Sequence, residues 1–300
     1  MATLKEVKTK IGAVKKTKQI TKAMNMVAAS RLRGAQNNME GFRPYAVKFA
    51  EVLGGLSGRA GDEINPLLLP HEEVIKKHIV LCTSDRGLCG GFNAHLVSKA
   101  KSFIEEAGDD EDIEFSVTNF GKKGRDWCRK KQIPIISEHL GVIGTVIRFN
   151  IASTVGKGLI DGFLNGEYDE VYVVYSEFIS MGRQVATVKQ LLPITPLETD
   201  EDESEDQDQD RPYLAEHICE PSPDELLGEL LPMSVYVQLY RALLETSTSE
   251  HAARMMAMDN ASKACDDMIE NLTLAYNKAR QAEITAELMD IVGGAEALKG

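Results

Sequence analysis

The sequence has 300 residues, of which 43% are hydrophobic and 27% are charged. These values argue against a wholly disordered chain, and the apolar runs, such as 79–82 and 171–175, are far shorter than the roughly 20 residues of a membrane-spanning helix. Five scattered cysteines without a C-x-x-C pair argue against a disulfide framework or a zinc site, so reduced, mostly buried thiols are expected. The N-terminus lacks the apolar core of a secretory signal, which favours a cytosolic compartment.

The net charge of -12 is unevenly distributed along the chain. Residues 1–33 contain nine lysines and arginines and one glutamate, whereas residues 198–210 contain nine acidic residues and no basic one. A basic segment on an acidic protein is compatible with nucleic acid, an anionic membrane surface or an acidic protein groove. Composition alone does not choose among these partners.

Residues 1–57 are predicted to form a long coiled-coil helix. Leu4, Val7, Ile11 and Val14 have heptad spacing, and a drifting apolar stripe follows. The members of that stripe are Ile20, Met24, Val27 or Ala28, Leu32, Ala35 and Met39. Pro44 should kink this helix without ending it, because the apolar pattern resumes immediately afterwards.

After a linker at 58–76, residues 77–193 are predicted to form a Rossmann-like α/β domain. Buried strands are expected at 79–83, 113–119 and 171–176, with a more polar strand at 185–191 and helices at 93–107, 122–131 and 151–165. This alternation implies a mainly parallel sheet. The connection 179–183 is too short for a crossover helix, so the last two strands should form an antiparallel hairpin.

The remainder divides into an acidic loop at 194–221, interpreted as a solvated segment, and a C-terminal coiled-coil helix at 222–300. Pro232 is expected to interrupt this helix. A second heptad seam is predicted near its end, together with small seam residues that allow close approach of a partner helix. The seam comprises Ile284, Leu288, Ile291, Ala295 and Leu298, and the small residues are Ala252, Ala264, Ala275, Ala279 and Ala282. The predicted fold class is therefore α/β plus a long antiparallel coiled coil formed by the N- and C-terminal helices.

The stretch 83–93 is the most enzyme-like part of the sequence, because it is a glycine-rich turn between a strand and a helix. It matches neither G-x-G-x-x-G nor G-x-x-x-x-G-K-[ST]. Gly87, Gly90 and Gly91 are therefore interpreted as a structural turn, with phosphate binding as the alternative. Cys89 as a nucleophile would need a base, for which His95 is the nearest candidate.

No histidine pair has metal-ligand spacing, and the methionines of the two terminal helices are interpreted as flexible core filling rather than a cofactor lining. No metal and no cofactor are expected. Lys8, Lys15, Lys18 and Lys22 are spaced so as to lie on one face beside the apolar seam. This face is compatible with solvation alone, with an acidic protein partner, or with nucleic acid or lipid.

Three segments resemble the signature segments of F-type ATP synthase gamma subunits: ITKAMNMVAAS at 20–30, TSDRGLCGG at 83–91 and YNKARQAEIT at 276–285. The resemblance covers nearly the whole chain in the same order. It implies a non-catalytic rotor, the central stalk of the catalytic head, whose terminal helices form a bent antiparallel coiled coil inside a ring of alternating alpha and beta subunits.

The same resemblance implies roles for individual residues. The basic helix with Lys8, Lys15, Lys18, Lys22 and Met24 would contact an acidic loop of a beta subunit. Residues of the C-terminal helix would hydrogen-bond a beta-subunit loop, namely Arg280, Gln281, Thr285 and Glu287. Its tip, with Ile291, Val292 and Leu298, would turn in an apolar bearing.

The resemblance also implies a setting and leaves two other interpretations open. The α/β domain would contact the epsilon subunit and the ring of membrane-embedded c subunits, at the cytoplasmic face of a bacterial inner membrane, and no nucleotide is expected on this chain. The acidic run 198–210 is longer and more charged than the family requires, and no cysteine pair matches the regulatory dithiol of chloroplast members. The alternatives are a phosphate- or nucleotide-binding α/β enzyme and a non-rotary coiled-coil scaffold.

Overall fold

The computed structural model describes residues 4–57, 65–71, 73–107, 113–194 and 223–297. The chain divides into two compact units. One combines residues 1–30 with residues 254–300, and the other comprises residues 31–253. The two terminal helices, α1 (Leu4–Ser57) and α5 (Pro223–Ala297), each contribute to both units. We call the first unit the paired-helix unit and the second the α/β unit.

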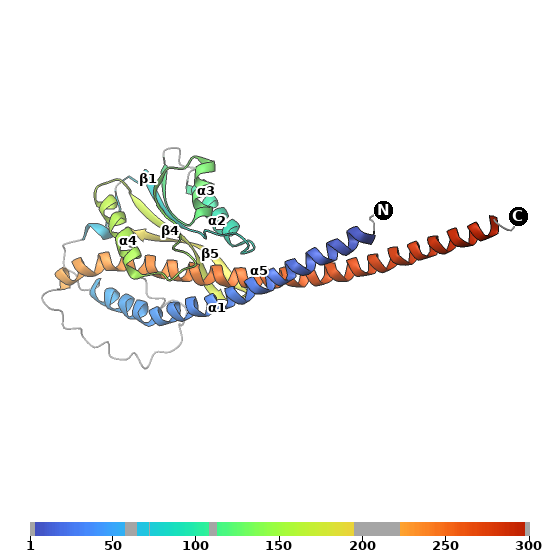
Figure 1. Cartoon of the computed structure of the whole chain (residues 1–300). Helices are drawn as coiled ribbons and strands as arrows, with labels where there is room; N and C mark the ends of the chain where they lie inside the picture. Colours follow the sequence, from blue (N-terminus) through green and yellow to red (C-terminus); the bar gives the residue numbers. More distant parts are fainter. Residues whose placement is uncertain (1–3, 58–64, 72, 108–112, 195–222, 298–300) are drawn as a thin grey trace, which may run out of the picture. The chain divides into compact units, whose positions relative to one another are not determined.

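The α/β unit is built on a five-stranded sheet of order β3-β2-β1-β4-β5. Figure 1 labels β1, β4 and β5 of this sheet. Its strands are β1 (Lys76–Cys82), β2 (Glu114–Phe120), β3 (Ile135–His139), β4 (Glu170–Ser180) and β5 (Arg183–Leu192). The first four strands are parallel, and β5 pairs antiparallel with β4. The expected parallel sheet with a terminal hairpin is therefore confirmed.

Helices cover both faces of this sheet because successive side chains of a strand point to opposite faces. Ile79 and Leu81 of β1 pack with α2 (Phe92–Ala107) and α3 (Lys122–Lys131). Val80 and Cys82 pack instead with α4 (Phe149–Leu164) and the parts of α1 and α5 that belong to the α/β unit. The short 3-10 helix η1 (Pro66–Leu68) adds Leu67 to this second core.

The sequence analysis missed β3, whose five residues alternate between half-buried and exposed and form one edge of the sheet. Pro232 does not interrupt the C-terminal helix, contrary to expectation, since α5 runs through it, whereas α1 continues through Pro44 as expected. The acidic run 198–210 and Cys219 lie outside the described residues, whereas the other four cysteines are buried as expected.

A buried histidine makes the stability of the α/β unit depend on pH. His78 on β1 is fully buried, contacts Ser116 and Thr118 through its two ring nitrogens at 2.7 and 2.9 Å, and packs against Tyr168. Burial lowers the pKa of His78 from 6.5 to about 4. Between these values the unfolded chain binds a proton that the folded chain does not, so the free energy of unfolding should decrease by up to about 3 kcal/mol as the pH falls.

The matching measurement is urea denaturation at pH 6.5 and at pH 4 for the wild type and for His78→Leu. Leucine cannot titrate, so the variant should lose less stability between the two pH values, although it starts lower because Ser116 and Thr118 lose their partner. An identical pH dependence in the two proteins would show that His78 is not responsible.

Candidate functional site

The glycine-rich turn after β1 is closed by hydrogen bonds among its own residues. The Asn93 side-chain oxygen accepts from the Ser84 backbone N–H at 3.0 Å, and the Asn93 amide donates to the Ser84 hydroxyl and to the buried Cys89 thiol at 2.9 and 3.1 Å. The Asp85 carboxylate accepts from the backbone N–H groups of Lys122 and Gly141 at 3.1 and 2.8 Å. These polar groups hold the turn to its neighbours, which favours the structural interpretation over phosphate binding.

The three glycines of this turn differ in what the backbone requires. Gly90 has a φ of 59°, a region that favours glycine, and a Cβ at Gly91 would lie 2.9 Å from the His95 ring. A Cβ at Gly87 would meet no atom within 4 Å. The stronger requirement lies at Gly121, which the sequence analysis did not single out and which combines a φ of 93° with a close approach to Thr83.

The paired-helix unit is an antiparallel coiled coil. Contacts from α1 reach lower residue numbers on α5 as α1 advances: Lys18 forms an ion pair with Asp266, the Thr21 and Ser262 hydroxyls are 2.8 Å apart, and the Asn25 amide donates to the Met255 carbonyl at 2.9 Å. The seam of α1 keeps heptad spacing. Its members are Leu4, Val7, Ile11, Val14, Lys18, Thr21, Asn25 and Ala28.

Part of the predicted seam is wrong. Ile20 is 61% exposed, because polar residues occupy the seam at this point. Of the two alternatives at the next position, Ala28 is buried, whereas Val27 is 55% exposed. Met24, Leu32, Ala35 and Met39 are buried or half-buried as expected. Every member of the predicted second seam at the end of α5 that the structure describes is also exposed: Ile284, Leu288, Ile291 and Ala295. Of the small residues, Ala252 is buried and Ala279 half-buried, whereas Ala264, Ala275 and Ala282 are exposed.

The four lysines of the predicted basic face do not share one position. Lys8, Lys15 and Lys22 repeat every seven residues and are exposed on α1. Lys18 lies in the seam, where it is half-buried and paired with Asp266. Met24 is half-buried and points about 200° away from Lys22, on the other side of the seam from the three exposed lysines. The exposed face therefore consists of three of the four predicted lysines.

The predicted contact residues near the end of α5 all lie at the surface. Arg280, Gln281, Thr285 and Glu287 are exposed, and the Thr285 hydroxyl donates to the Gln281 carbonyl within the helix at 2.9 Å. Ile291 and Val292 are 67% and 57% exposed, while Leu298 lies outside the described residues. Exposed apolar side chains on consecutive turns are typical of a surface that another protein covers.

Within the described residues, no helix is both long and apolar enough to span a membrane. Nor do His, Cys, Asp and Glu side chains come together in a described group of three or more that could hold a metal ion.

Comparisons with known proteins agree over the length of the chain. Residues 3–298 match the family model described as ATP synthase. The "ATP synthase gamma chain" of Desulfosudis oleivorans is 64% identical over all of both chains, and that of Desulforapulum autotrophicum is 59% identical over 99% of this chain and all of the other.

Solved structures show the same fold at lower identity. A chain of the Euglena gracilis mitochondrial ATP synthase described as OSCP/F1/c-ring, rotational state 3, has a TM-score of 0.65 at 19% identity and covers 98% of this chain and 94% of its own. A chain of the rotor of the same enzyme, in rotational state 1, has a TM-score of 0.60 at 18% identity, with coverages of 94% and 98%. Together with the family model and the full-length relatives, this fold establishes that the chain belongs to the family of ATP synthase gamma chains.

Proposed function

We propose that this chain is the central rotating shaft of an F-type ATP synthase, and that it transmits torque without catalysing a reaction itself. The observation that carries the proposal is end-to-end similarity to ATP synthase gamma chains at 64% identity. The paired-helix unit is suited to this role, because it is a coiled coil with exposed basic and apolar side chains at different positions along its length.

In the proposed mechanism, this chain makes different contacts with each of the three beta subunits. A shaft without threefold symmetry presents a different face to each of three beta subunits, so its rotation changes the relative free energies of their open, loose and tight states. Lys8, Lys15 and Lys22 would face an acidic loop of a beta subunit, which their exposure and charge permit. Lys18 would act within the shaft, since Asp266 already compensates its charge.

The end of α5 supplies two further contacts in this proposal. Arg280, Gln281, Thr285 and Glu287 would bind a beta-subunit loop and release it once in each turn. Ile291 and Val292, and with them Leu298, would turn against an apolar surface near the top of the ring. The high exposure of Ile291 and Val292 supports such a partner, because exposed apolar area of this kind is normally covered by another protein.

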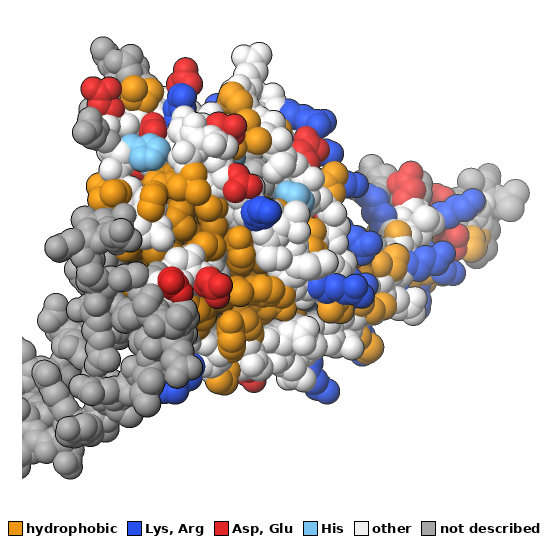
Figure 2. Space-filling model, turned by 90° about the vertical axis from the view of Figure 1, so that its left-hand side faces the viewer, with side chains coloured by type: hydrophobic (Ala, Val, Ile, Leu, Met, Phe, Trp, Pro, Cys, Tyr) orange, Lys and Arg blue, Asp and Glu red, His pale blue; other side chains and the backbone are white. Residues whose placement is uncertain are grey.

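The α/β unit would contact the epsilon subunit and the c-subunit ring, which places the chain peripherally at the cytoplasmic face of a bacterial inner membrane. Hydrophobic side chains gather on the face of this unit shown in Figure 2, beside scattered acidic and basic ones. Such a mixture of apolar and charged side chains permits a contact between subunits. The hydrogen bonds within the turn at 84–93 support a structural role for this turn rather than nucleotide binding.

The test is ATP hydrolysis by three preparations: this chain alone, alpha and beta subunits alone, and all three together. The proposal expects activity that appears or rises strongly only in the mixture. Turnover by this chain alone, or tight nucleotide binding to it, would instead support an α/β enzyme. Activity of alpha and beta subunits that is indifferent to this chain would support a non-rotary scaffold.

A further inference from the structure

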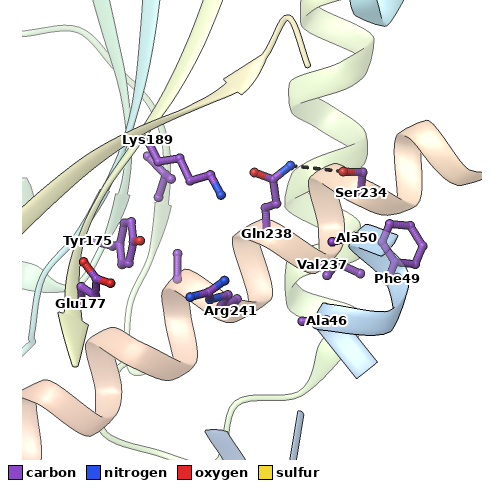
Figure 3. Close-up of a pocket in the computed structure, with 12 residues that line it drawn as sticks. Ala46, Phe49, Ala50, Tyr175, Glu177, Lys189, Ser234, Val237, Gln238 and Arg241 are labelled. Atoms are coloured by element: carbon purple, nitrogen blue, oxygen red, sulfur yellow. Dashed lines mark hydrogen bonds between the residues drawn. The ribbon is translucent and has the colours of Figure 1, made fainter. Parts of the chain in front are cut away.

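Two adjoining hollows lie within the α/β unit, between α1, the β4–β5 hairpin and α5. Their volumes are about 270 and 220 Å³, and both are lined by Ala46, Glu177 and Arg241. The larger one, shown in Figure 3, has room for the liquid volume of about nine water molecules. No function proposed above uses these hollows.

The larger hollow contains a lysine without an ionic partner. Lys189 of β5 lies directly opposite Val173 of β4, so its side chain shares the face of the sheet that carries Tyr175 and Glu177. It is half-buried, and no ion pair of Lys189 occurs in the described part of the chain. Burial lowers the pKa of Lys189, and the nearby Arg241 guanidinium lowers it further, more strongly than Glu245 or Glu177 raises it.

Among the other charged side chains around the hollows, one arginine and one glutamate compensate each other. Arg241 donates through Nε to Glu245 Oε1 at 2.8 Å, so these two charges compensate each other. The Glu245 side chain is only 8% exposed and lines the smaller hollow, and burial raises the pKa of its carboxyl. The side chains that line the smaller hollow carry two positive and two negative charges, from Arg43, Arg241, Glu177 and Glu245, whereas the end of the larger one at Lys189 attracts anions.

Tyr175 adds a neutral hydrogen-bond donor near Lys189 (Figure 3). Burial, with a contribution from Glu245, raises the pKa of Tyr175 to about 12, so its hydroxyl keeps its proton at neutral pH. The opposite wall is apolar and consists of Ala46, Phe49 and Ala50 of α1 with Val237 of α5. Convergent polar groups in a mainly apolar hollow are typical of small-molecule sites.

We propose that the larger hollow binds a small aliphatic monocarboxylate, whose carboxylate pairs with Lys189 and accepts from Tyr175 while its hydrocarbon part packs against α1. Glu177 lines the same hollow, where Figure 3 shows it beside Tyr175, and its carboxylate disfavours a second negative charge. The site should therefore prefer butyrate to succinate and to inorganic phosphate. It lies in the α/β unit and does not depend on the rotary function.

The test is isothermal titration of the full-length chain with butyrate, succinate, inorganic phosphate and the neutral isostere butyramide. Butyrate should bind, and the other three should bind at least about tenfold more weakly. Equal binding of phosphate, succinate or butyramide, or no binding of butyrate, would overturn the proposal.

Three variants connect this binding to the hollow. Lys189→Met keeps the hydrocarbon part of the side chain and should weaken butyrate binding about tenfold or more, whereas Lys157→Met, which changes an exposed lysine of α4, should not. Glu177→Gln removes the opposing carboxylate and should strengthen binding several-fold, a change that misfolding cannot produce. Unchanged binding in Lys189→Met, or weaker binding in Glu177→Gln, would place the carboxylate elsewhere and overturn the assignment.

Discussion

Arg280→Ala should lower ATP hydrolysis by the complex of this chain with alpha and beta subunits about tenfold, without a loss of helix content in the isolated chain. Arg280 is exposed on α5, so its removal leaves no buried partner uncompensated, and alanine is the best helix former. The expected loss arises from the proposed beta-subunit contact, where a guanidinium provides several hydrogen bonds in a fixed geometry. The measurements are steady-state hydrolysis by the assembled complex and circular dichroism of the chain alone.

Lys278→Ala is the matched control, because Lys278 is exposed on the same helix but points about 200° away from Arg280. Removal of this positive charge should change hydrolysis little. Equal losses in the two variants would indicate a general effect of charge, and a fall in helix content for Arg280→Ala would make Arg280 structural rather than a contact residue.

Gly121→Ala should lower the free energy of unfolding of the α/β unit by at least about 3 kcal/mol. Gly121 has a φ of 93° and a ψ of 152°, a region that is essentially restricted to glycine. A Cβ there would lie 2.1 Å from the Thr83 carbonyl oxygen, which is backbone and cannot rotate away as a side chain could. Thr83 is itself fixed, since its backbone N–H donates to the Phe120 carbonyl at 2.8 Å.

The control is Gly87→Ala in the neighbouring glycine-rich turn, where a Cβ would meet no atom within 4 Å. Its free energy of unfolding in urea should stay within about 0.5 kcal/mol of the wild type. A large loss at Gly87 with a small one at Gly121 would contradict the assignment of the steric requirement to the contact between β2 and β1.

The resemblance of three segments to gamma subunits was a stronger signal than any single residue. The family assignment was confirmed over residues 3–298, because a long match in order is specific where a short motif is not. The sequence did not predict which of the basic side chains of α1 would be exposed and which would pack against α5. Four lysines formed one basic face in the sequence pattern, but Lys18 belongs to the seam, since its charge has a partner on α5 that is 248 residues away.

The sequence by itself determined the regular elements with strong periodicity. Four of the five strands and the helices between them follow from apolar runs and helical spacing, because these patterns are local and reflect burial of one face or both. The heptad at Leu4, Val7, Ile11 and Val14 likewise predicted the seam at the start of α1.

Only the tertiary structure decided the features that depend on partners distant in the chain. The polar edge strand β3 forms because β2 provides hydrogen bonds, not because its own pattern requires a strand. The exposure of Ile284, Leu288 and Ile291 depends on where the partner helix ends, and the hollow at Lys189 exists because α1, β4, β5 and α5 converge there. Heptad spacing specifies which face of a helix is apolar, but the register of the two helices decides which part of that face is buried.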